Sequence, residues 1–154
     1  MNNIARKKPQ PSGGQALCPC RARDAVPWPY AQCCQPWHLG LAHQTFAPTA
    51  VQLMRARYSA YALATQNNPL GHAMLNFLHA TWHHSTAPGD LELSPIQWLG
   101  LDVLHAEQTA LAGVVEFVAH CKEGGKAHTL HETSRFVFSA GRGWQYIDGD
   151  IALA

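Results

Sequence analysis

Four of the five cysteines in this chain lie close together near its N-terminus. They form two short pairs, Cys18 with Cys20 and Cys33 with Cys34, and His38 follows four residues after the second pair. Cysteine thiolates and histidine nitrogens, arranged in two short pairs with a loop between them, are the usual ligands of a tetrahedral structural zinc ion. The spacing therefore predicts one structural zinc ion per chain.

Two ligand sets are compatible with this spacing. We favour a site made by the four cysteines, Cys18, Cys20, Cys33 and Cys34. In the alternative set His38 replaces one cysteine of the second pair, which would make the site one unit less negative. A redox-active dithiol is disfavoured, because neither pair has the two-residue spacer of the Cys-x-x-Cys motif.

The composition predicts a cytoplasmic protein with a single packed core. The 154 residues are 47% hydrophobic, yet no apolar run approaches the length of a membrane span and the N-terminal residues lack the apolar middle of a secretory signal. Clustered cysteines in a reducing compartment bind metal more often than they form disulfides. A net charge of +1 gives no electrostatic reason to expect a membrane or nucleic acid as partner.

The order of the predicted elements places helices before strands. Residues 1–17 contain almost nothing to bury and are expected to form a disordered arm, and the proline-rich residues 18–40 form the cysteine module, here called the zinc knuckle. Apolar residues at three- and four-residue steps predict helices over residues 49–66 and 70–81. After these helices the periodicity changes to alternation, which predicts four strands over residues 98–107, 111–121, 127–139 and 144–148.

Short turns join the later predicted strands. Glu123-Gly124-Gly125-Lys126 and Gly141-Arg142-Gly143 are too short for the crossover that parallel strands need, so these strands must be antiparallel. Helices followed by an antiparallel meander predict an α+β fold. We expect residues 41–154 to form one domain in which a curved antiparallel sheet has its helices packed on one face.

Several segments resemble a known family. Cys18-Pro19-Cys20 and Tyr30-Ala31-Gln32-Cys33-Cys34 resemble the SEC-C zinc motif, although the loop between them is longer than in that motif. Residues 53–61, 80–83, 130–136 and 144–150 are similar, in order, to the YchJ-like family of bacterial proteins. The resemblance implies a SEC-C knuckle followed by a cone-shaped domain like that of nuclear transport factor two (NTF2-like). It implies no particular reaction.

A cone-shaped sheet closed by helices leaves an interior cavity where polar groups could act. Glu132 shares its strand face with apolar residues, so its carboxylate needs a partner, and Arg55 or Arg57 on the first helix could supply one. The cluster would then either fix helix to sheet or form a working pocket. The residues proposed for that pocket are Arg55, Tyr58, Trp82, His83, Glu132 and Arg135.

Two functions remain open at this point. In the first, the protein binds a partner protein through the knuckle or a small molecule in the cavity, with Arg21, Arg23 and Tyr30 as the partner-facing edge. In the second, the cavity is an enzyme site that uses Glu132 or His131 as an acid–base group. We favour binding, because no recognisable catalytic constellation is present and a zinc ion with four protein ligands has no open position for a substrate.

Overall fold

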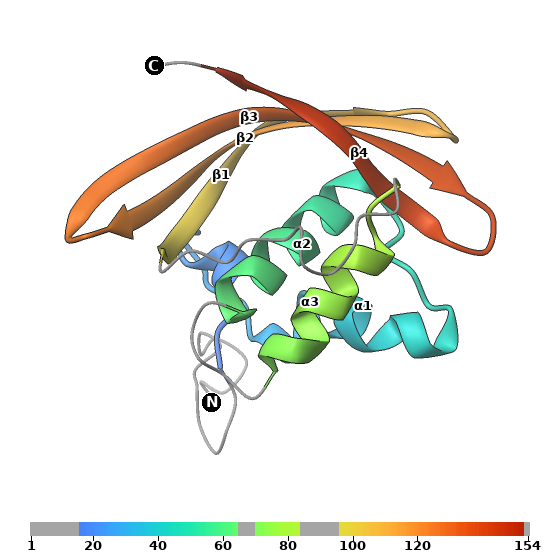
Figure 1. The fold of residues 1–154 in the computed structure, drawn as a ribbon, viewed down its shortest axis with the longest axis horizontal. Helices are drawn as coiled ribbons and strands as arrows, with labels where there is room; N and C mark the ends of the chain where they lie inside the picture. Colours follow the sequence, from blue (N-terminus) through green and yellow to red (C-terminus); the bar gives the residue numbers. More distant parts are fainter. Residues whose placement is uncertain (1–15, 65–69, 84–95, 153–154) are drawn as a thin grey trace, which may run out of the picture.

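A curved sheet lies over a layer of helices (Figure 1). The computed structural model describes residues 16–64, 70–83 and 96–152, so nearly all of the predicted arm lies outside the described residues. Among the described residues, no helix is both long and apolar enough to cross a membrane.

The observed elements follow the predicted order. The helices are α1 (Gln35–Gly40), α2 (Ala50–Ala64) and α3 (Gly71–Ala80), with short 3-10 helices at Pro19–Arg21, Tyr30–Gln32 and Leu41–His43. The strands are β1 (Gln97–Gln108), β2 (Ala112–Glu123), β3 (Lys126–Ser139) and β4 (Gly143–Ala152). Within the knuckle the helices are short, and Pro19 and Pro36 lie in the first turns of the first 3-10 helix and of α1, where proline is well tolerated.

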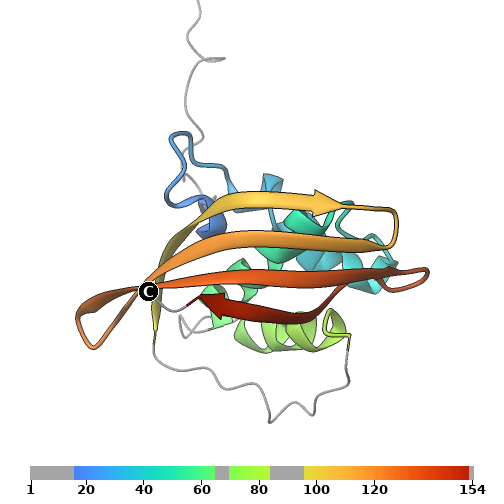
Figure 2. The same ribbon diagram turned by 90° about the horizontal axis from the view of Figure 1, so that it is seen from above.

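The four strands pair in the order β1-β2-β3-β4, and every neighbouring pair is antiparallel. Seen from above, they lie side by side with the helices beneath them (Figure 2). Gly124 and Gly125 have positive φ in the β2–β3 turn, which glycine adopts without the steric cost of a Cβ atom. The predicted α+β class, with an antiparallel sheet and helices on one face, is confirmed.

One detail of β1 differs from the predicted alternation. Strict alternation over residues 98–107 would place Leu99 and Leu101 on the same strand face. In the structure Trp98 pairs with Cys121 and Leu101 pairs with Ala119, and a register shift makes Leu99 the extra residue of a bulge. The bulge brings Trp98 to the helix side of the sheet, where its ring packs edge-on against Tyr58 of α2 at 5.7 Å between centroids.

Helix α2 lies in the middle of the molecule and contacts both layers. Leu53, Ala56 and Ala60 are buried in a core that also contains Cys18 and Cys34. On its sheet side, the Tyr58 hydroxyl accepts a hydrogen bond of 2.6 Å from the backbone N–H of Gly100 in β1. The knuckle and the sheet therefore share one helix and one continuous core.

The contact between α2 and β2 depends on Gly113, because a Cβ atom there would lie 2.6 Å from the Cβ of Ala50. We expect Gly113→Ala to lower the free energy of unfolding by about 1–3 kcal/mol through overpacking. Gly71→Ala is the control, since at Gly71 a Cβ atom has only ordinary contacts, beginning at 3.6 Å. Urea denaturation of both variants measures the difference. Equal stability would contradict the close packing at Gly113.

Candidate metal centre and cavity

The backbone brings the two cysteine pairs together. The N–H of Cys18 donates to the carbonyl of Trp28 and the N–H of Tyr30 donates to the carbonyl of Ala16, each at 2.7 Å, so the ends of the intervening loop are joined. Cys20 lies in the first 3-10 helix, and Cys33 and Cys34 directly precede α1. The longer loop thus still closes on itself and presents both pairs to the same point.

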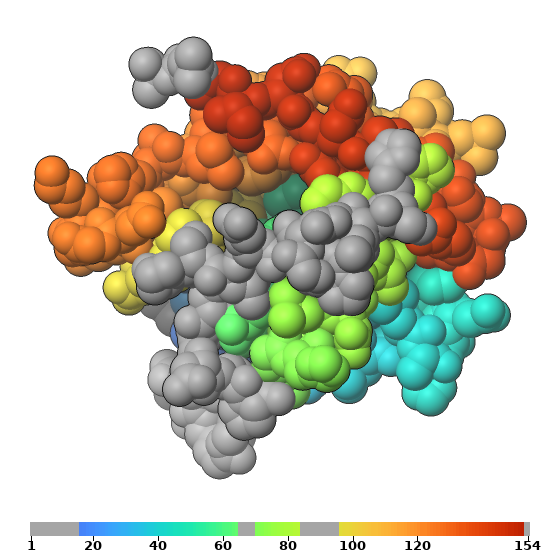
Figure 3. Space-filling model, in the orientation of Figure 1, coloured from blue at the N-terminus to red at the C-terminus, as the bar shows by residue number. Residues whose placement is uncertain are grey.

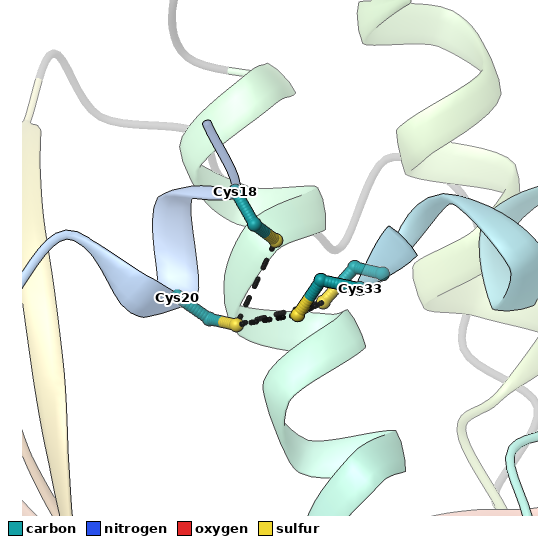
Figure 4. Close-up of side chains that lie close together, drawn as sticks. Cys18, Cys20 and Cys33 are labelled. Atoms are coloured by element: carbon teal, nitrogen blue, oxygen red, sulfur yellow. Dashed lines mark hydrogen bonds between the residues drawn. The ribbon is translucent and has the colours of Figure 1, made fainter. Parts of the chain in front are cut away.

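The four thiols of the knuckle converge beside α2 (Figure 4, where three are labelled). Their Sγ atoms all lie within 4.8 Å of one another. The closer separations are 3.6 Å for Cys20–Cys33, 3.7 Å for both Cys18–Cys20 and Cys20–Cys34, and 4.0 Å for Cys33–Cys34. Tetrahedral zinc with Zn–S bonds of about 2.3 Å separates its sulfur ligands by about 3.8 Å. All four cysteines are free thiols, so the cluster has the donors and the dimensions of a zinc site.

Side chains around the cluster donate to it. The Ser59 hydroxyl of α2 donates to Cys34 Sγ at 3.3 Å, and Arg21 Nε donates to Cys33 Sγ at 3.4 Å. Arg55, one turn before Ser59 on α2, donates from its guanidinium to the carbonyl of Cys20 at 3.0 Å. Donors and positive charge of this kind stabilise sulfur ligands that carry negative charge.

The thiols ionise unequally without a metal. Hydrogen bonding from Cys20 lowers the pKa of Cys18 to about 7, and hydrogen bonding from Cys18 lowers the pKa of Cys33 far below its ordinary range. Hydrogen bonding with Cys18 raises the pKa of Cys20 and of Cys34. Four adjacent sulfurs cannot all be negative without a cation. Metal binding would therefore release protons from this cluster.

His38 lies outside the sulfur cluster. Its Nε2 donates to the carbonyl of Ala56 in α2 at 2.7 Å, and its Nδ1 accepts from the Tyr30 hydroxyl. Because both ring nitrogens are engaged, neither is left for a metal ion, and the geometry favours the ligand set of four cysteines over the set with His38. His38 instead ties the knuckle to α2.

The predicted partner-facing edge of the knuckle is partly occupied by contacts within the chain. Arg21 also donates to Asp24 at 3.1 Å, and Arg23 Nε donates to Asp102 in β1 at 3.1 Å. The ring of Trp37 packs against the core, whereas Trp28 is 44% exposed, with the Arg21 guanidinium 5.3 Å from its ring centroid.

A cavity of about 340 Å³ lies between α2 and the inner face of the sheet. Most of its wall is apolar or aromatic, and includes Met54, Trp98, Phe117, Ala119, Leu130 and Phe136. In Figure 3 the surface is hollowed between the sheet above and α3 below, with part of α2 visible in the hollow. A volume of this size is at the lower end of the range for small-molecule sites.

Glu132 is the one carboxylate among the described residues that line the cavity. Its Oε2 accepts hydrogen bonds from the Ser134 hydroxyl at 2.6 Å and from the Tyr146 hydroxyl at 3.2 Å. Gly149 on β4 makes room for this carboxylate, since a Cβ atom there would lie 2.2 Å from Glu132 Oε2. The side chain is therefore held in place within the sheet.

Arg57 of α2 is buried in the cavity wall. Its guanidinium donates to the carbonyl of Leu78 at 2.8 Å and to the hydroxyl of Thr81 at 2.7 Å. The rings of Trp82 and Tyr146 lie 5.7 Å and 5.0 Å from its central carbon. Burial lowers the pKa of Arg57. No salt bridge joins it to another described residue, so Arg57 and Glu132 share the cavity without a direct ion pair.

The other predicted pocket residues have different positions. Tyr58 and Trp82 line the cavity together with Glu132, but Arg55 contacts the knuckle and His83 does not belong to the cavity wall. Arg135 is on the opposite strand face, where it forms ion pairs with Asp148 and Asp150, because neighbouring residues of a strand alternate between faces.

The wall also contains residues outside the predicted pocket set. Trp98 reaches it through the β1 bulge, and Tyr146 and Ser134 reach it as the donors to Glu132. The alternation of β3 already placed Ser134 on the face of Glu132, whereas no sequence signal marked the bulge.

The fold and the cysteine cluster define the class of protein: an NTF2-like α+β domain preceded by a SEC-C type cysteine motif. The family model described as "YchJ, middle NTF2-like domain" matches residues 49–149. The chain is 46% identical to a UPF0225 protein of Cupriavidus metallidurans, over 90% of this chain and 91% of that one. It is 44% identical to a UPF0225 protein of Ralstonia nicotianae, over 96% and 99% of the two chains. The chain belongs to this YchJ-like, UPF0225 family, which confirms the predicted resemblance.

Solved structures with the same architecture contain the motif as well. A SEC-C motif containing protein from Psychrobacter arcticus has a TM-score of 0.66 and 28% identity, covering 89% of this chain and 83% of that chain. A SEC-C motif containing protein from Rhodopseudomonas palustris has a TM-score of 0.62 and 25% identity, covering 84% and 96%.

Burial of His38 makes the stability depend on pH. Desolvation lowers the pKa of His38 from about 6.5 to about 4, so between these values the unfolded chain binds a proton that the folded protein does not. The free energy of unfolding should therefore fall as the pH drops through this window. His38→Gln keeps a nitrogen donor but has no ionisable side chain at this position. We expect the free energy of unfolding of this variant to fall with decreasing pH less steeply than that of the wild-type protein, by up to about 1.4 kcal/mol per pH unit.

Urea unfolding of both proteins at pH 7, 6 and 5 and at one fixed zinc concentration measures these slopes. Protonation of the cysteine thiolates affects both proteins alike and cancels in the difference. If the free energy of unfolding changed with pH equally in the two proteins, this result would contradict a buried, neutral His38.

Proposed function

We propose that the protein is a binding protein whose structural zinc ion is held by Cys18, Cys20, Cys33 and Cys34. The observation that carries the zinc assignment is the mutual approach of four free thiols within 4.8 Å, with separations that match a tetrahedral sulfur site. The SEC-C motif of the structural relatives supports the same assignment. When bound, the ion would supply the positive charge that four thiolates need, and four protein ligands would leave no position for a substrate.

The zinc ion would serve to fix the N-terminal segment against α2. In the two 3-10 helices of the knuckle Cys20 is the only buried residue, and Cys18, Cys20 and Cys34 are almost fully buried against the core. Without the ion, the thiolate charge favoured at Cys18 and Cys33 would lack a counter-ion at this buried position, which opposes the burial. We therefore expect metal loss to release the knuckle from α2.

Metal analysis tests this assignment. Protein purified under reducing, chelator-free conditions should contain about one zinc ion per chain, and Cys20→Ser should remove it because the site loses one of four ligands. Cys121→Ser is the matched control, since Cys121 is a buried free thiol in β2 outside the cluster. Absence of zinc from the wild-type protein, or its loss from Cys121→Ser, would contradict the ligand set.

Binding is favoured over catalysis by the composition of the cavity wall. An acid–base enzyme would use Glu132, but no histidine and no second carboxylate line the cavity among the described residues. His131, the other candidate base, makes a hydrogen bond of 2.7 Å between its Nε2 and a carboxylate oxygen of Glu116 and is not part of the cavity wall. Tyr58 and Tyr146 also line the cavity, but burial raises the pKa of both, which moves them further from the range in which a side chain exchanges protons efficiently near neutral pH.

The knuckle loop also supports a role in protein contact. Trp28 and Val26 are 44% and 52% exposed, and Arg21 lies over the Trp28 ring. Aromatic and arginine side chains are the types that most often anchor protein interfaces. The contact surface that we propose is therefore centred on Trp28, because Arg23 is engaged with Asp102.

Capture of proteins from native lysate tests the knuckle surface. Trp28→Ala, with its zinc retained, should lose a partner that the wild-type protein captures, because the largest exposed ring of the loop is removed. Leu111→Ala is the control, since Leu111 is 64% exposed in the turn between β1 and β2, outside the knuckle. Undiminished capture by Trp28→Ala would reject the loop as the contact surface.

A further inference from the structure

The charge balance of the cavity indicates which ligands it would accept. Among its described lining residues, Arg57 and Glu132 are the two charged side chains, one positive and one negative, so the net charge of the wall is zero. Burial raises the pKa of Tyr58 and of Tyr146, and both rings therefore remain uncharged near neutral pH. A ligand with a net charge would leave an unbalanced charge in a largely apolar cavity, which is unfavourable.

The two charged side chains of the wall differ in how far their hydrogen-bonding groups are already used. Arg57 already donates to Leu78 and Thr81, and aromatic rings lie beside its guanidinium. Glu132 accepts two hydrogen bonds, both at Oε2, and within the described part of the chain no hydrogen bond reaches its Oε1. A carboxylate oxygen only accepts hydrogen bonds, so a ligand must offer a donor to satisfy it.

The remaining wall favours a flat, apolar body. Trp98, Phe117 and Phe136 contribute aromatic surface, and Ala119 and Leu130 contribute aliphatic surface. A ligand made of rings would therefore bind to this wall more favourably than a ligand made of flexible polar chains. The volume of about 340 Å³ restricts the ligand to a small number of rings.

We infer that the cavity is a binding site for an uncharged aromatic or alicyclic molecule that carries one hydroxyl or similar donor, which hydrogen-bonds to Glu132 Oε1. The ring system lies against Trp98 and Phe117, and Arg57 balances the charge of Glu132 from the α2 side without contacting the ligand. This site is distinct from the cysteine cluster and does not depend on what the knuckle binds.

Four probes that share one ring system test the inference by isothermal titration calorimetry on the full chain. They are 2-naphthol, naphthalene, 2-naphthoate and 2-naphthylmethylammonium. We expect 2-naphthol to bind at least about tenfold more tightly than each of the others, because it alone is uncharged and offers a donor. No binding by any probe, or equal or tighter binding of one of the other three, would overturn the inference.

A pair of glutamate variants locates the donor contact. Glu132→Gln leaves one acceptor oxygen, which Ser134 and Tyr146 already use, so the affinity for 2-naphthol should fall about tenfold. The same variant gives the cavity a net positive charge, so the affinity for 2-naphthoate should rise. Glu116→Gln makes the same substitution at a glutamate that contacts His131 outside the cavity, and it should leave the probe order unchanged. Equal effects of the two variants would overturn the assignment to Glu132. The order of the probes on the wild-type protein decides the inference even if Glu132→Gln does not fold.

Discussion

The packing of the cysteine cluster against α2 is the constraint on which the rest of the structure depends. Ser59 and Arg55 of this helix donate to the knuckle, and His38 of the knuckle donates back to Ala56. The next residues along α2, Arg57 and Tyr58, point to the cavity and the sheet. Because a helix turns about 100° per residue, one short stretch of α2 contacts the cysteine cluster on one side and forms part of the cavity wall on the other.

The same arrangement explains the buried charge of Arg57. A guanidinium in a core is costly unless its donors are satisfied. Here the carbonyl of Leu78 and the hydroxyl of Thr81 at the end of α3 accept from it, and the aromatic rings beside it add cation–π attraction. Arg57 therefore joins α2 to α3 and also sets the charge of the cavity.

Periodicity and spacing predicted the elements that the backbone forms with regular geometry. The apolar steps of α2 and α3, the alternation of β2 and β3, and the cysteine pairs all follow from local rules, and the structure has them near the predicted positions. The β1 bulge was not predictable, because register depends on how β1 pairs with β2. The partners of His38 and Arg57 were also missed, since each is a backbone carbonyl or hydroxyl from a distant segment.

Two features that were not predicted from the sequence, the β1 bulge and the position of Gly149, shape the cavity. The bulge turns Trp98 inward, where it forms a wall, and the absence of a side chain at Gly149 lets Glu132 lie within the sheet, held by Ser134 and Tyr146. A leucine in place of Glu132 would leave the buried charge of Arg57 without a counter-charge and the hydroxyls of Ser134 and Tyr146 without their acceptor, and each of these losses lowers stability. Residues from β3, β4 and α2 thus act together to keep one carboxylate in an otherwise apolar wall, and the binding role proposed for the cavity would account for that arrangement.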